Sequence, residues 1–254
     1  MNPIYLLLFF LLGIILGEIF TTIGIRLSDD DEKLFCRNHC DHCYHKLTFL
    51  ETIPLLSYIF LKGKCKYCHK KIDIKNPIIE LFTGILYVLT FYVFGFSYEL
   101  LIGLGIISLL VIVCVSDLTY LIIPDEVLIF FSGYFAIIQY FHLGLTGLFE
   151  HIIIGIFLFT IMYTIMLVGD KLLGRESLGG GDVKIMFLFG LVLDPLLGTL
   201  TIFLGSMLAL PISLIILKRN KNNVIPFGPF LLLAFTLIYF VRLTPELIIN
   251  WLGF

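Results

Sequence analysis

Eight stretches of predominantly apolar residues run along the chain, and more polar connections separate them. A bilayer core about 30 Å thick takes roughly 20 apolar residues to cross as a helix. Helix is the expected form, because backbone polar groups cannot be left open to lipid. The expected helices span residues 4–25, 78–96, 100–116, 127–141, 152–168, 183–193, 196–217 and 227–241. This pattern predicts an all-α polytopic integral membrane protein with about eight transmembrane helices.

The composition excludes an ordinary soluble domain. Hydrophobic residues make up 59% of the 254 residues, charged residues make up 14%, and the mean hydropathy is +1.04. Soluble domains average about 45–50% apolar and about 25% charged residues. The net charge of −2 provides no basic field for nucleic acid, so membrane lipid is the expected environment.

The basic residues predict how the helices are oriented. Ten of the 17 Lys and Arg residues lie between Arg26 and Lys75, and with eight crossings 16 of the 17 fall on one side. Arg242 is the exception. The positive-inside rule makes the basic side cytosolic, and both termini then lie outside the cytosol.

The stretch at residues 183–193 is too short for a full crossing. At about 1.5 Å per residue it reaches only about half the bilayer core, so the preceding Gly179, Gly180, Gly181 and Asp182 are expected below the membrane surface. Irregular backbone at that depth is tolerated only inside the protein or along a wet cavity, which suggests a site. Local thinning of the membrane over a short helix is the alternative.

Five of the six cysteines lie in the segment expected in the cytosol. Four of them form two C-x-x-C pairs, and this arrangement is typical of a tetrahedral zinc site. The cytosol is reducing, so structural disulfides are disfavoured there, while redox-active pairs remain the main alternative. The predicted zinc ligands are Cys40, Cys43, Cys65 and Cys68.

Two carboxylates at the expected cytosolic edge stand out, because acidic residues beside apolar spans are costly. Asp117 follows a long apolar run, and Asp182 follows three glycines on a different expected helix. Two carboxyl groups in a poorly solvated site would share one proton and could activate a water molecule. A catalytic pair, an ion or proton path, and simple helix caps all remain open from the spacing alone.

Neighbouring charged residues have simpler interpretations. Asp125 and Glu126 follow Pro124 and open a helix, so we interpret them as helix caps. Lys184 is expected to reach towards the membrane surface or to hold a carboxylate charge.

Several motifs in order resemble one family. The chain carries Gly17-Glu18-Ile19-Phe20 with Arg26-Leu27, the C-x2-C-x21-C-x2-C spacing, Ile53-Pro54-Leu55-Leu56-Ser57-Tyr58, Asn76-Pro77-Ile78-Ile79-Glu80, Asp117 with Pro124-Asp125, and Gly179-Gly180-Gly181-Asp182-Val183-Lys184. In this order and spacing, the motifs resemble those of the type IV prepilin leader peptidases, which are membrane aspartic peptidases of bacteria. Two loop positions depart from the family pattern: Asp41 replaces a usual proline, and Thr52 a usual asparagine.

The resemblance implies a function and a division of the chain. It implies that Asp117 and Asp182 cleave the leader of prepilins or pseudopilins after a glycine, on the cytosolic face of the bacterial plasma membrane, in type IV pilus assembly or protein secretion. It also implies N-methylation of the new N-terminus by S-adenosylmethionine, with Glu80 as a candidate residue. We expect a first transmembrane helix at residues 1–25, a cytosolic zinc-binding loop at 26–77 and a peptidase core at 78–254.

Other functions stay open from the residues alone. A transporter or proton channel would use the aspartates as relay groups. A membrane-anchored zinc scaffold would depend on the cysteines but not on Asp182. A membrane thiol oxidoreductase would cycle its Cys-x-x-Cys pairs between the reduced and oxidised forms.

Overall fold

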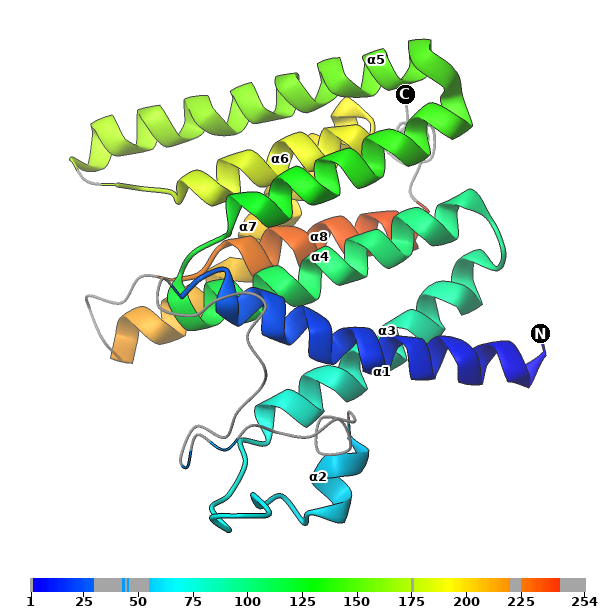
Figure 1. Ribbon diagram of the computed structural model, residues 1–254. Helices are drawn as coiled ribbons and strands as arrows, with labels where there is room; N and C mark the ends of the chain where they lie inside the picture. Colours follow the sequence, from blue (N-terminus) through cyan, green and yellow to red (C-terminus); the bar gives the residue numbers. More distant parts are fainter. Residues whose placement is uncertain are drawn as a thin grey trace. The chain divides into compact units, whose positions relative to one another are not determined.

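The computed structural model describes residues 2–29, 43, 45, 55–174, 176–219 and 225–242. These residues form eight helices, and their only β pairing is an isolated bridge between Lys64 and Lys71. The helices are α1 Pro3–Arg26, α2 Leu56–Phe60, α3 Lys75–Phe94, α4 Tyr98–Tyr120, α5 Asp125–Leu173, α6 Gly180–Val192, α7 Pro195–Arg219 and α8 Gly228–Phe240 (Figure 1). The predicted all-α class is confirmed.

Five of the described helices are long and apolar enough to cross a membrane, namely α1, α3, α4, α5 and α7. The chain is therefore a multi-pass membrane protein. Helices α6 and α8 have 13 residues each, which is about 20 Å at 1.5 Å per residue and less than a bilayer core. The prediction of a short helix near residue 183 is confirmed, although its first turn begins within the glycines.

The chain divides into two compact units, Met1–Gly95 and Phe96–Phe254. The first unit holds α1 to α3, and the second holds α4 to α8. The three-part division expected from the sequence stays a prediction.

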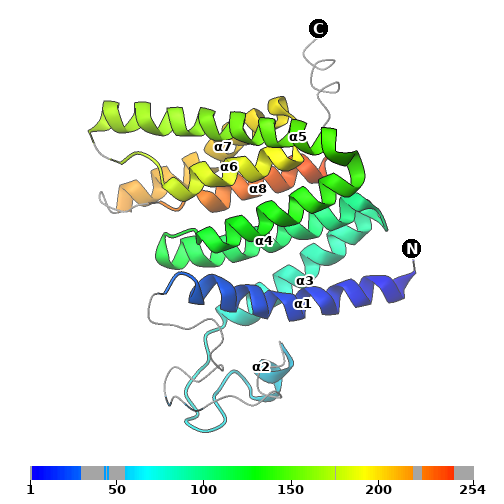
Figure 2. The same cartoon turned by 45° about the horizontal axis from the view of Figure 1, so that its top comes forward.

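In the first unit, α1 and α3 pack together through small residues (Figure 2). A methyl group on Gly13 would lie 2.8 Å from the Cα atom of Gly84, and one on Gly17 would lie 3.0 Å from the Cα atom of Glu80. Glycines four residues apart let membrane helices approach this closely. This contact brings the buried Glu80 next to the backbone of α1.

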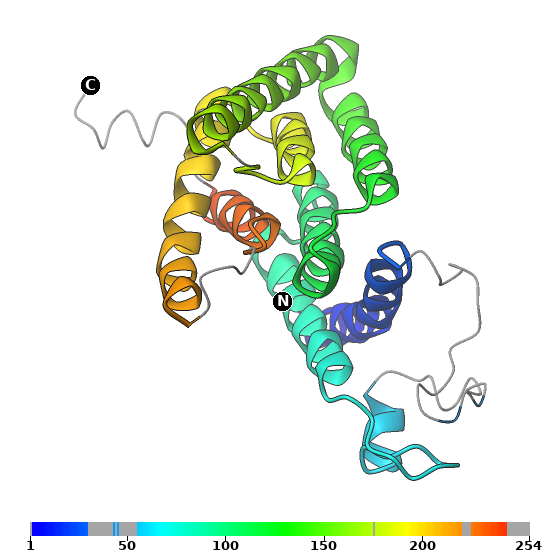
Figure 3. The same cartoon turned by 90° about the vertical axis from the view of Figure 1, so that its left-hand side faces the viewer.

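In the second unit, α6 lies between the two arms of α5 (Figure 3). The arms meet at Gly144, whose φ of 74° and ψ of −172° break the helix at a conformation that favours glycine. The predicted stretches 127–141 and 152–168 fall on separate arms. Eight of the 13 residues of α6 are buried, and Phe189 of α6 stacks on Phe235 of α8 at 4.3 Å.

The carboxyl end of α6 is buried, and polar side chains from both arms of α5 satisfy it. The side-chain amide of Gln139 donates to the Leu191 carbonyl at 2.9 Å, and His151 Nδ1 lies 3.1 Å from the Gly190 carbonyl oxygen. Carbonyls in the last turn of a helix have no partner within the helix. These two side chains therefore allow α6 to end inside the protein.

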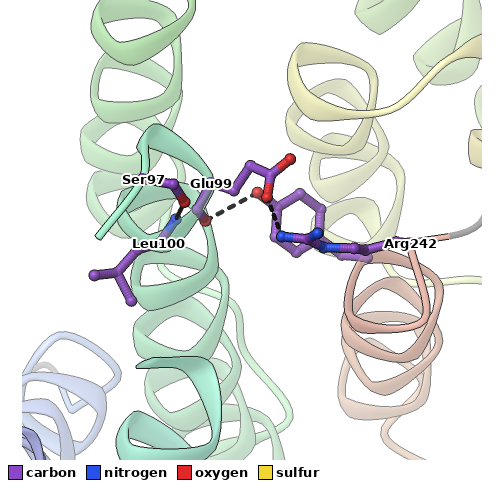
Figure 4. Close-up of polar contacts among 5 residues, drawn as sticks. Ser97, Glu99, Leu100 and Arg242 are labelled. Carbon is purple, nitrogen blue, oxygen red and sulfur yellow. Dashed lines mark hydrogen bonds and ion pairs between the residues drawn. The ribbon is translucent and has the colours of Figure 1, made fainter. Parts of the chain in front are cut away.

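The carboxyl end of α8 is tied to the beginning of α4. The Tyr239 hydroxyl donates to the backbone carbonyl of Glu99 at 3.0 Å. The Glu99 carboxylate pairs with the Arg242 guanidinium, and Ser97 caps α4 by accepting from Leu100 N–H (Figure 4). We name the contacts of Glu99 with Tyr239 and Arg242 the far-end anchor of α8.

Replacing Gln139 with leucine is expected to lower the free energy of unfolding by about 1–3 kcal/mol, because the Leu191 carbonyl would lose its donor in a buried place. Thermal unfolding in detergent measures the change. Thr160→Val is the control, since this exposed hydroxyl bonds only to its own helix. Equal stability of Gln139→Leu and the unchanged protein would contradict the role assigned to the amide.

Candidate active site

Asp117 and Asp182 lie on different helices of the second unit, and both are buried. Asp117 stands in the last turn of α4 and Asp182 in the first turn of α6. Their exposed fractions are 5% and 6%. Burial to this degree is rare for carboxyl groups without charged partners, so the pair is a candidate for chemistry.

The two carboxyl groups meet beside Gly228, the first residue of α8. A Cβ atom on Gly228 would lie 3.1 Å from Asp117 Oδ2 and 3.2 Å from Asp182 Oδ1. The two oxygens are therefore at most 6.3 Å apart, the sum of those distances. Neither oxygen has a hydrogen-bond partner among the described residues. One small molecule can thus contact both groups at once.

Backbone groups at helix beginnings hold both side chains. The Asp117 carboxyl accepts from the backbone N–H of Gly228, where α8 begins. The Asp182 carboxyl folds back on the N–H of Gly179, the N-cap residue of its own helix. Helix N-termini carry partial positive charge, which offsets part of the cost of a buried carboxylate. Asp182 thus lies inside the helix and is not its N-cap.

The glycines before Asp182 differ in what surrounds them. A methyl group on Gly181 would come within 2.8 Å of Ile123 Cβ, whereas one on Gly180 would meet nothing within 4 Å. Gly181 therefore allows α6 to begin against the segment that joins α4 to α5. Ile123 in that segment also faces Gly228, with its Cδ1 2.9 Å from the Cβ position.

The interpretation of Asp125 and Glu126 as caps is wrong. Pro124 occupies the N-cap position of α5, and the helix has no side-chain cap hydrogen bond. Asp125 is instead bound to Lys184 of α6, whose Nζ lies 2.6 and 2.8 Å from its carboxylate oxygens. Because the helix begins at Asp125 itself, this side chain lies in the first turn and not at the N-cap position. Its ion pair with Lys184 joins the beginnings of α5 and α6. Lys184 therefore holds a carboxylate charge.

Three of the four predicted metal ligands converge in the first unit. The sulfur atoms of Cys43, Cys65 and Cys68 all lie within 4.8 Å of one another, and the first two are 4.0 Å apart. Sulfurs around tetrahedral zinc at about 2.3 Å would be about 3.8 Å apart. The spacing therefore fits this metal. Cys40 lies outside the described residues.

Short backbone contacts shape the turn that presents Cys65 and Cys68. The N–H of Cys65 donates to the Lys70 carbonyl at 2.9 Å, and the N–H of His69 donates to the Cys65 carbonyl at 3.0 Å. His69 has a φ of 56°, so the chain turns back sharply after the second cysteine. This closed turn keeps both thiols on one side.

Glu80 has a structural partner in the same unit. Its Oε2 accepts the N–H of Leu55 at 2.7 Å, and its exposed fraction is 6%. The carboxyl therefore fastens the segment before α2 to α3. Whether it takes part in methyl transfer stays a prediction.

Sequence reasoning missed the parts of the second unit that surround the pair. Gly228 and Ile123 are not polar, so the cost of burying a polar group does not mark them in the sequence. Gln139 and His151 do carry this signal, because each is a polar residue within or beside an apolar stretch. Their distance from any recognised motif hid their role at the end of α6.

Comparisons with known proteins cover most of the chain. Residues 11–94 match the bacterial Peptidase A24 N-terminal domain, and residues 104–214 match the type IV leader peptidase family. The prepilin leader peptidase/N-methyltransferase of Bacillus subtilis is 35% identical over 190 residues, which is 72% of each chain. The Myxococcus xanthus protein of that name is 32% identical over 203 residues, covering 78% of this chain and 60% of its own. No solved structure matches the chain.

Replacing Gly181 with alanine is expected to lower the free energy of unfolding by about 1–3 kcal/mol, because the methyl group would overpack against Ile123. Thermal unfolding in detergent reports the effect. Gly180→Ala is the matched control in the same helical turn, where the methyl group meets open space. Similar melting of the two variants would mean that α6 does not need the close approach at Gly181.

Proposed function

Because this chain belongs to the type IV leader peptidase family, we propose that it is a membrane aspartic endopeptidase that removes the leader of prepilin-like proteins. The proposed cleavage follows a glycine on the cytosolic face of the bacterial plasma membrane. The observation that supports this most strongly is the convergence of two buried carboxyl groups beside Gly228.

The proposed chemistry needs one proton shared between Asp117 and Asp182. The ionised carboxylate takes a proton from water, and the water oxygen attacks the scissile carbonyl carbon. The protonated carboxyl gives its proton to the carbonyl oxygen as the tetrahedral intermediate forms. The first carboxyl, which now holds the proton from water, gives it to the amide nitrogen. The second takes a proton back from a hydroxyl of the intermediate as the C–N bond breaks, so the pair again shares one proton. The products are the carboxyl terminus of the leader and a new N-terminal amine.

The charge distribution supports a cytosolic site. The aspartates lie near the beginnings of α5, α6 and α8. In the sequence, the stretches that lead into α6 and α8 carry the basic residues Lys171, Arg175, Lys218, Arg219 and Lys221. Basic connections stay in the cytosol. A substrate helix would lie in the bilayer while its leader reaches the pair from the cytosolic side.

We propose that the same chain methylates the amine that cleavage releases. The printed names of its relatives combine leader peptidase with N-methyltransferase. S-adenosylmethionine is the proposed methyl donor. The first unit, with its cysteines and the buried Glu80 bound to Leu55, is the proposed place for this second activity.

Zinc is the proposed metal of the cysteine site, with Cys40, Cys43, Cys65 and Cys68 as ligands. The distances among three of the sulfurs support this assignment. The metal would supply folding energy to a loop that is too small for a core of its own.

Asp117→Asn and Asp182→Asn are each expected to reduce prepilin cleavage by about a thousandfold or more, because amides can neither accept nor deliver the shared proton. The purified variants are incubated with a prepilin in detergent, and the product mass reports leader loss. Asp194→Asn is the control, since this exposed carboxylate stands just beyond the opposite end of α6.

Near-normal cleavage by either active-site variant would reject the assigned chemistry. A proton path instead predicts proton flux in liposomes and tolerance of Asp117→Glu. The same preparations can therefore separate the two functions.

The purified full-length protein is expected to contain about one zinc ion per chain, because four thiolates complete a tetrahedral site. Metal analysis measures the content, and Cys65→Ser is expected to lose most of it. Cys114→Ser on α4 is the control, since that cysteine lies in the other unit. Full zinc content in Cys65→Ser would exclude this cysteine as a ligand.

A further inference from the structure

The first turn of α8 closes one side of the space between the two carboxyl groups. Gly228 is buried at the beginning of α8, and Pro229 follows it. The place where a side chain at position 228 would begin lies 3.1 Å from Asp117 Oδ2 and 3.2 Å from Asp182 Oδ1. A side chain at this position would therefore press against both carboxyl groups.

Ile123 closes the same space from a second side. Its Cδ1 atom lies 2.9 Å from that Cβ position, and its Cβ atom lies 2.8 Å from the corresponding position on Gly181. Ile123 thus sits between the beginnings of α6 and α8. The space beside the carboxyl oxygens is bordered by one isoleucine methyl group and one bare α-carbon.

Both carboxyl oxygens that face this space lack a hydrogen-bond partner within the described part of the chain, and both side chains are more than nine-tenths buried. Buried polar atoms are normally paired, so unpaired acceptors that face one space indicate a polar ligand. Peptide backbone and water can supply the missing donors. A bulky apolar side chain cannot.

We infer that Gly228 and Ile123 form a gate that admits the main chain of the substrate but no side chain beside the bond to be cut. This inference rests on the proposed function and deepens it, because it assigns the requirement for glycine at the cleavage point to two residues of the enzyme. A glycine in the substrate would pass with its α-carbon against that of Gly228. An alanine would place its methyl group against Ile123 Cδ1.

The test compares two prepilins that differ only in glycine or alanine before the scissile bond. For the unchanged protein, kcat/KM is expected to favour glycine by about a hundredfold, within the range that one methyl group supplies in a tight pocket. Ile123→Ala is expected to reduce this ratio about tenfold, through faster cleavage of the alanine substrate. Gly228→Ala is expected to slow cleavage of the glycine substrate about a hundredfold.

Matched controls separate a gate from general damage. Ile122→Ala removes a neighbouring isoleucine that is 50% exposed, and Gly133→Ala adds a methyl group where nothing lies within 4 Å. Both are expected to leave the glycine-to-alanine ratio unchanged. Damage to the fold would lower cleavage of both substrates alike, whereas the gate changes their ratio.

A folded, active Ile123→Ala enzyme with an unchanged ratio would overturn the inference, as would full activity of Gly228→Ala. Should Ile123→Ala fail to fold, Ile123→Val removes only the Cδ1 methyl group and is expected to change the ratio in the same direction. Failure of the unchanged protein to cleave either prepilin would instead reject the proposed function itself.

Discussion

Lipid offers no hydrogen bonds to backbone polar groups, so a helix end that is buried at membrane depth must find its partners in the protein or in a wet cavity. This constraint shapes the second unit. Helices α6 and α8 are too short to span a bilayer core, and their ends therefore fall where other helices must supply hydrogen bonds. Gln139 and His151 do so at the carboxyl end of α6, and Tyr239 anchors α8 to α4.

The same constraint explains where the candidate chemistry is located. Asp117 ends α4, Asp182 begins α6, and Gly228 begins α8, so three helix termini meet at one place. Backbone N–H groups at the beginnings of helices are the donors that a buried carboxylate needs, and they require no side chain. The carboxyl groups can therefore lie close together while one oxygen of each stays available.

Much of this arrangement could be predicted from the sequence. Long apolar runs predict the helices, because hydropathy depends on the sequence alone and not on which residues pack together in space. For this reason the two stretches on either side of Gly144 could be predicted as separate helices. We expected Asp117 and Asp182 to lie at the same end of their helices' bundle, and their positions agree with this. Their catalytic role stays a prediction. Asp125 was misread because its partner, Lys184, lies on another helix. The role of Gly228 was not predicted, because the sequence does not show that the first turn of α8 lies against Asp117 and Asp182.

The far-end anchor of α8 has a consequence for the turn that carries Gly228. Tyr239 in the last turn of α8, and Arg242 just beyond the helix, bind Glu99 at the beginning of α4. A helix of 13 residues is stiff over this length. Its first turn cannot slide away along the helix axis when a larger group arrives. If Gly228 selects the substrate as inferred above, this wall would be preorganised and would need no closing motion.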